Sequence, residues 1–199
     1  MNIYGLGGIG KSTLLDQYQR IALNEGAIFL RVDSRDFTHT PQGFTNFIAY
    51  LLQISPDPSS NMETLQMCIS RLEEMSQQQK VVLALDTYEI MHSLDDWLRE
   101  MFISRLPRNL ILIISGRTPL QEMWRAHPHW CELVHPIALE QLSFQDVGHY
   151  AQLYNFEDPR IHKELYALTQ GHPLMLAIIL EMKAREDTEF CNAPHCQDT

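Results

Sequence analysis

Residues 5–13 read GLGGIGKST, a stretch in which four of the first six residues are glycine and a lysine and two hydroxyl residues follow directly. Glycine at this density costs backbone entropy on folding, so it indicates that something comes very close to the main chain. The stretch fills the pattern G-x-x-x-x-G-K-[ST] at Gly5, Gly10, Lys11 and Ser12. In this pattern successive backbone N–H groups turn inward around phosphate oxygens. The stretch therefore predicts a phosphate-binding loop.

The segments on either side of the loop supply the strand and the helix that the pattern requires. Residues 2–4, NIY, are typical of a short strand, and the residues from Lys11 predict a helix that ends at Gly26. The apolar face predicted for this helix consists of Leu14, Leu15, Tyr18, Ile21 and Ala22. Its N-terminus adds unpaired N–H donors and a partial positive charge, which favour an anion at the loop.

Each residue of the loop has an expected contact with a nucleotide. We expect Lys11 to reach the terminal phosphates, Ser12 to complete the coordination of Mg²⁺ through its hydroxyl, and Thr13 to lie close to the α-phosphate. The remaining contacts are expected from the backbone of Gly5, Gly7, Gly8, Ile9 and Gly10. The predicted ligand is a nucleoside triphosphate with its metal.

A second anchor for the metal is predicted in the segment VVLALDTYE, residues 81–89. Its first part is a continuous apolar run, typical of a strand buried on both faces, and Asp86 ends the run. A carboxylate in this position can hold Mg²⁺, usually through water, and Glu89 can orient or deprotonate the attacking water. The alternatives are a strand-end carboxylate in a turn and a solvated loop glutamate.

A third candidate is Arg117, in the segment IISGRTP. It follows an apolar strand predicted over residues 109–115, and parallel α/β sheets bind ligands at the carboxyl ends of their strands. An arginine there can contact the γ-phosphate and report its presence. The alternative is a surface arginine.

Apolar strands alternate with amphipathic helices up to about residue 139, which predicts a mostly parallel sheet covered on both faces. We therefore expect a three-layer α/β core over residues 1–140, a small helical subdomain over 141–184 and a disordered tail over 185–199. The other predicted strands span residues 27–33 and 133–139. The other predicted helices span residues 42–53, 62–76, 94–105, a segment after Pro119, 143–153 and 161–183, the last with a break at GHP.

Composition limits the compartment and the partners. The formal net charge is −10, with no cluster of Lys and Arg, so we expect no direct nucleic-acid contact by this domain. No apolar run approaches the roughly 20 residues that cross a bilayer, and the N-terminus lacks the features of a signal peptide. We expect a cytoplasmic protein without membrane contact, whose four cysteines stay reduced.

Several classes of P-loop protein are disfavoured by missing motifs. The chain contains no N-K-x-D or D-x-x-G motif of GTP enzymes, no LSGGQ of transport ATPases and no Arg-rich lid of small-molecule kinases. Instead GLGGIGKST, VVLALDTYE, IISGRTP and the later LTQGHPLML resemble the STAND class of P-loop ATPases, the NB-ARC and NACHT relatives and their bacterial cousins, over about residues 3–180.

The resemblance implies roles for particular residues. In that class an arginine closes the strand after the Asp-bearing strand, and a G-x-P motif in the helical subdomain touches the adenine; Arg117 and the pair Gly171 and Pro173 match these positions. A proline after a glycine break also presents a flat apolar surface on which a purine can stack, whereas the alternative is an ordinary helix junction.

The resemblance also implies a function. It predicts an ATPase that binds ATP or ADP with Mg²⁺, hydrolyses slowly and acts as a nucleotide-dependent switch. Because members of the class carry sensor and effector domains and assemble into oligomers, we expect this chain to be the nucleotide-binding core of a larger protein. Three alternatives stay open: an AAA+-like turnover ATPase, a phosphotransferase acting on a small molecule, and a scaffold that binds nucleotide without chemistry.

Overall fold

The computed structural model describes residues 1–57, 59–120, 124 and 133–191, and it divides the chain into two compact units. The core unit comprises Met1–Leu6 and Lys11–Ala138. The helical unit comprises Gly7–Gly10 together with the chain from Leu139 onward. Most of the helix predicted after Pro119 lies outside the described residues.

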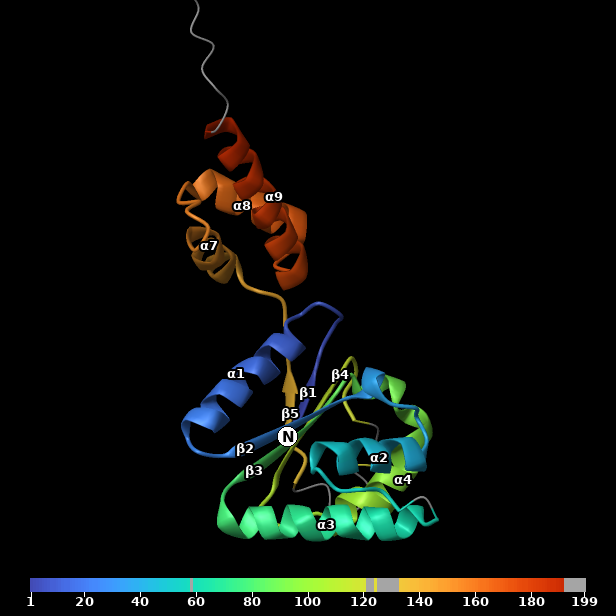
Figure 1. Ribbon diagram of the computed structural model, residues 1–199. Coiled ribbons are helices and arrows are strands. Elements are labelled where there is room, and N and C mark those ends of the chain that lie inside the picture. The colour runs from blue at the N-terminus through green and yellow to red at the C-terminus, as the bar shows by residue number, and fades with distance from the viewer. Residues whose placement is uncertain (58, 121–123, 125–132, 192–199) are drawn as a thin grey trace, which may run out of the picture. The chain divides into compact units, whose positions relative to one another are not determined.

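The described residues of the core unit form a parallel five-stranded sheet in the order β2-β3-β4-β1-β5 (Figure 1). The strands are β1 (Asn2–Tyr4), β2 (Ile28–Asp33), β3 (Val81–Asp86), β4 (Ile111–Gly116) and β5 (Pro136–Ala138). In the register Tyr4 lies beside Gly116 and Asp33 beside Asp86, so neighbouring strands end level with one another. The carboxyl ends therefore share one edge of the sheet, where such folds bind ligands.

Burial along the strands follows their place in the sheet. All six residues of β3 are buried, as the apolar run predicts for a strand covered on both faces. β4 differs from its prediction at the start, where Ile111 is 49% exposed, and becomes buried from Ile113 onward. The buried part of β4, four of its six residues, lies next to the shared carboxyl edge.

Helices cover the two faces of this sheet, α1 on one face and α2, α3 and α4 on the other (Figure 1). Their bounds are α1 (Lys11–Asn24), α2 (Pro41–Leu51), α3 (Asn61–Gln78) and α4 (Asp95–Trp97). The face predicted for α1 is only partly correct, because Leu15 and Ala22 are buried while Ile21 is 58% exposed. The three-layer α/β arrangement is as predicted.

The segment predicted as one helix over residues 94–105 is helical without a break over residues 95–105, but the type of its turns changes along the chain. It consists of α4, the π-helical turn η4 (Leu98–Phe102) and the 3₁₀ turn η5 (Ile103–Arg105), and two further 3₁₀ turns, η2 (Tyr88–Ile90) and η3 (His92–Leu94), precede it. The change from α to π turns accompanies burial of a charged residue among apolar ones: Arg99 is 8% exposed, and Leu98 and Phe102 are fully buried. Arg99 donates hydrogen bonds to Asp95 and Asp96 within this segment, contacts that apolar periodicity alone does not predict.

The described part of the helical unit holds α7 (Phe144–Gln152), α8 (Pro159–Thr169) and α9 (Pro173–Cys191). Ser143 caps α7 with a capping box to Asp146, as expected from its place before the helix. α9 runs past Lys183, where the predicted helix ends, to Cys191. The core of the unit is formed by Val147, Ala151, Leu165, Leu176 and Leu180. None of the helices in the described ranges is long and apolar enough to cross a bilayer.

Candidate functional site

The glycine-rich stretch lies between the end of β1 and the start of α1, as predicted. Gly8 and Gly10 have φ of +74° and +100°, values that side-chain-bearing residues rarely adopt, so these two glycines allow the loop to turn. A Cβ on Gly10 would meet no atom within 4 Å, which leaves its backbone accessible to a ligand. The side chain of Ile9 is buried, so only its backbone can take part in binding.

Lys11 begins α1 and folds its ammonium group back on the loop. Its Nζ donates hydrogen bonds to the carbonyl oxygens of Gly5 at 2.7 Å and Leu6 at 2.9 Å. Desolvation lowers the pKa of Lys11, an effect opposed by the negative charge of Glu89 and reinforced by Arg117. The ammonium thus lies where anionic oxygens can replace two neutral carbonyls as its partners.

Asp86 and Ser12 come together although 74 positions separate them. The Ser12 hydroxyl donates to Asp86 Oδ2 at 3.0 Å, and the backbone N–H of Thr87 donates to Asp86 Oδ1 at 2.9 Å. Asp86 is 1% exposed, at the buried end of β3. A serine that donates its proton to a carboxylate keeps oxygen lone pairs for a cation, so this pair fits the hydroxyl-and-carboxylate donor set of Mg²⁺ sites in P-loop proteins.

Glu89 and Arg117 also meet at the carboxyl edge of the sheet. Arg117 Nε donates to Glu89 Oε1 at 2.9 Å, with the arginine side chain 67% exposed and the glutamate 18% exposed. Glu89 Oε2 is buried and has no hydrogen-bond partner among the described residues. A cavity of about 10 Å³, which has room for about one water molecule, borders both residues. One oxygen of Glu89 is thus held by a cation and the other is available to a small donor.

Arg31 is a site residue that the sequence analysis missed. It lies in β2 and pairs through Nη2 with Asp86 Oδ2 at 2.5 Å and through Nη1 with Asp16 Oδ1 at 2.6 Å. Burial works against its charge, but the hydrogen bonds to the two aspartates outweigh burial and raise the pKa of Arg31. The signal in the sequence is an arginine in the middle of a strand, IFLRVD, whose other residues before the final Asp33 are apolar.

A buried polar network supports the segment that carries Glu89. Asp95 accepts hydrogen bonds from the Tyr88 hydroxyl at 2.6 Å, from Trp124 Nε1 at 2.9 Å and from Arg99 Nε at 3.2 Å. Burial raises the pKa of Tyr88, and the hydrogen bond to Asp95 raises it further. Tyr88 therefore acts as a fixed donor that ties the turn after β3 to the core.

Within the helical unit, the GHP break lies against the loop glycines. His172 Nε2 donates to the Gly7 carbonyl at 2.9 Å, and the backbone N–H of Leu174 donates to the Gly8 carbonyl at 3.3 Å. Gly171 has φ of +76°, and Pro173 is the first residue of α9. The residues expected to touch the base thus begin the helix that contacts the glycine-rich stretch.

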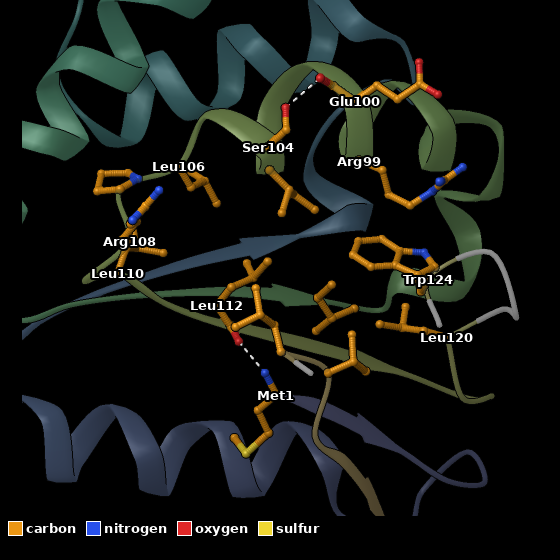
Figure 2. A pocket seen from close by; sticks show the side chains of 15 residues that line it. Met1, Arg99, Glu100, Ser104, Leu106, Arg108, Leu110, Leu112, Leu120 and Trp124 are labelled. Atoms are coloured by element: carbon orange, nitrogen blue, oxygen red, sulfur yellow. Dashed lines mark hydrogen bonds between the residues drawn. The ribbon is translucent and has the colours of Figure 1, made fainter. Parts of the chain in front are cut away.

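The core unit also contains a larger cavity of about 880 Å³, whose lining includes Leu112 and Ile114 of β4 (Figure 2). Figure 2 shows the amino group of Met1, which donates to the Leu112 carbonyl at 2.8 Å, beside mainly apolar side chains that include Leu106, Leu110 and Trp124.

These features define an α/β fold with a P-loop between its first strand and first helix. No family model and no curated protein matches the sequence. The fold is similar to that of the Aeropyrum pernix ORC2 protein in its ADP form, with a TM-score of 0.66 and 14% identity over 96% of this chain and 58% of that one. It is also similar to the Aeropyrum pernix ORC1 protein in complex with DNA, with a TM-score of 0.64 and 16% identity over 95% of this chain and 54% of that one.

A third similar fold is that of Drosophila ORC bound to DNA, with a TM-score of 0.63 and 14% identity over 96% of this chain and 50% of that one. The chain spans a little over half the length of the archaeal chains and half of the Drosophila one. Identities this low show a shared fold, so the roles of individual residues rest on the geometry of this chain.

Proposed function

We propose that this chain is an ATP- and Mg²⁺-binding module that acts as a STAND-type nucleotide-dependent switch with slow hydrolysis. The observation that carries the proposal is the contact between Ser12 and Asp86, because it joins the end of the glycine-rich loop to the end of a buried strand. A plain glycine turn requires no such partner. The similar ORC2 structure is an ADP form of its protein, which agrees with an adenine nucleotide as the ligand.

Each residue has one task in the proposed mechanism. Lys11 exchanges its carbonyl partners for phosphate oxygens, while the amides of the loop and of the α1 N-terminus, including Thr13, surround the phosphates. Ser12 and Asp86 hold Mg²⁺, which supplies charge neutralisation between the phosphates when bound. Glu89 orients water through its unpaired oxygen, and Arg117 contacts the γ-phosphate.

Two observations favour a STAND-type switch in particular. Arg117 directly follows β4, at the position where this class carries its arginine, and the GHP break with Pro173 lies against the loop glycines. We propose that Gly171 and Pro173 present the surface on which the adenine stacks. A ligand held in this way would bias the conformation of the helical unit, which is how such switches act.

An AAA+-like turnover ATPase is the second candidate, and the similar folds of the ORC proteins favour it. It predicts assemblies that form with ATP and faster hydrolysis, whereas a slow switch hydrolyses without this stimulation. A phosphotransferase would instead consume ATP when a small acceptor is added. Size-exclusion chromatography with and without ATP, combined with a phosphate-release assay, separates these outcomes.

The partners of the chain are also proposed. We infer that it works with sensor and effector domains or as a homo-oligomer, in the cytoplasm. The net charge of −10 favours no direct nucleic-acid contact, although two of the similar structures are of proteins bound to DNA. A DNA titration at low salt tests this, because backbone contacts are strongest there.

The first experiment is a titration with a fluorescent ATP analogue and Mg²⁺, in competition with ATP, ADP and GTP. We expect displacement by ATP and ADP but not by GTP. Lys11→Ala should weaken binding about 100-fold, since charge-assisted contacts to phosphate contribute about 3 kcal/mol. Lys80→Ala is the matched control, because Lys80 is exposed and should leave affinity unchanged. Equal binding by the Lys11 and Lys80 variants would refute the proposed phosphate site.

A further inference from the structure

Arg31 forms an ion pair with Asp86, the carboxylate that is proposed to hold the metal. It lies on β2, one of the two edge strands of the described sheet, and its two terminal nitrogens contact different carboxylates. Nη2 contacts Asp86 Oδ2 at 2.5 Å, and Nη1 contacts Asp16 Oδ1, on α1, at 2.6 Å. All three residues belong to the core unit. A permanent positive charge is therefore built in beside the proposed metal ligand.

The acceptor positions of Asp86 are nearly all used. Oδ2 accepts from both Arg31 and Ser12, Oδ1 accepts from the backbone of Thr87, and the side chain is 2% exposed. A carboxylate has about four lone-pair positions. Water bound to Mg²⁺ would donate to the same carboxylate, and the oxygen that faces Ser12 is the one that Arg31 contacts. Arg31 and the hydrated cation therefore compete for one oxygen.

Asp16 gives Arg31 a second place to bind. Its side chain is 54% exposed, whereas that of Arg31 is 25% exposed, so the guanidinium bridges the buried carboxylate and a solvent-facing one. If the cation takes Asp86 Oδ2, Arg31 keeps an anionic partner at Asp16 and stays paired. The geometry thus provides both states of an exchange between an arginine and a divalent cation.

We propose that Arg31 is a positioning residue that takes the place of the divalent cation at Asp86 in the metal-free protein and moves toward Asp16 when the metal binds. This inference rests on the proposed nucleotide function. Under this inference, Arg31 sets the metal concentration at which the complex of protein, nucleotide and metal is half formed. Two variants of the triad then have effects of opposite sign. Loss of Arg31 removes the competitor, and loss of the Asp16 charge removes the alternative partner.

The experiment measures Mn²⁺ binding by electron paramagnetic resonance, using the full chain saturated with a non-hydrolysable ATP analogue. We expect Arg31→Gln to lower the half-saturating Mn²⁺ concentration about tenfold, since it removes one positive charge beside a divalent cation. We expect Asp16→Asn to raise that concentration severalfold. Arg35→Gln is the matched control, because Arg35 is 67% exposed and pairs with Asp33, so it should change little.

The outcomes separate the two proposals. If the parent binds the ATP analogue and Mn²⁺, but Arg31→Gln binds Mn²⁺ equally or more weakly, the competition is overturned and the proposed function stands. Asp16→Asn keeps this test decisive if Arg31→Gln misfolds, because Asp16 is exposed, and an unchanged Mn²⁺ affinity there also overturns the inference. If the folded parent binds neither analogue nor Mn²⁺, both proposals fall.

Discussion

Replacing Asp95 by asparagine tests the buried network that holds the turn carrying Glu89. Asp95 Oδ1 accepts from Tyr88 and Trp124, whereas Oδ2 accepts from Arg99 Nε at 3.2 Å. An asparagine that keeps its oxygen toward Tyr88 and Trp124 directs an NH₂ group at Arg99, so one donor faces another. The variant thus breaks one ion pair while it preserves side-chain size and two hydrogen bonds.

The expected cost follows from the burial of this pair. The side chains of Asp95 and Arg99 are 12% and 9% exposed, so little water compensates for the lost contact. Removing one partner of a buried ion pair costs about 3–5 kcal/mol. Because Arg99 keeps its contact with Asp96, we expect a lower value of about 2–3 kcal/mol. For a chain of this length that free energy lowers Tm by about 4–12 °C.

Thermal and urea unfolding, followed by tryptophan fluorescence and circular dichroism, measure this loss. Asp96→Asn is the matched control, because it removes the other carboxylate that contacts Arg99, on a side chain that is 75% exposed. Exposed ion pairs contribute about 0–1 kcal/mol, so the control should change Tm little. The reasoning is refuted if Asp95→Asn melts like the parent, or if the two variants are destabilised equally.

Two further predictions concern the turn after β3 and the GHP break. Glu89→Gln should keep nucleotide affinity and slow phosphate release at least about 100-fold, as for loss of a general base, and an unchanged rate would remove Glu89 from the chemistry. Gly171→Ala should destabilise the helical unit by more than about 1 kcal/mol, on the order of the cost of a strained backbone, because its Cβ would lie 2.0 Å from the Leu142 carbonyl at φ of +76°. Gly26→Ala, at φ of +69° with no atom within 4 Å, is the control; an equally large loss of Tm there would contradict the steric argument.

The features that the sequence predicts well are those encoded by neighbouring residues. The loop is a fixed pattern of glycine, lysine and serine, and β3 is a run of apolar residues that ends in Asp86. Ser143 lies at a fixed distance from Asp146, so the capping of α7 follows from local chemistry. These features can be predicted because they depend on neighbouring residues and not on contacts with distant parts of the chain.

The features that the sequence does not predict depend on register and on buried partners. Arg31 reaches Asp86 because β2 lies beside β3 with Asp33 level with Asp86, and no pattern within β2 fixes this alignment. The turns of residues 92–105 contain the buried ion pair of Asp95 and Arg99. The apolar periodicity of a helix does not predict such a pair. The exposure of Ile21 on the predicted apolar face of α1 is likewise not indicated by the periodicity of that helix.

The order of the strands gives a physical basis for linking phosphate contact to catalysis in the proposed mechanism. β4 lies between β1 and β3, so its end lies between the start of the loop and Asp86. The Gly5 N–H donates to the Gly116 carbonyl at 3.3 Å, and a Cβ on Gly116 would lie 3.6 Å from Glu89 Oε2. The next residue, Arg117, already holds the other oxygen of Glu89. A guanidinium carries five N–H donors, so in the proposed mechanism Arg117 contacts the γ-phosphate through its Nη groups while Nε stays on Glu89. One side chain then links the phosphate to Glu89, and no further relay is required.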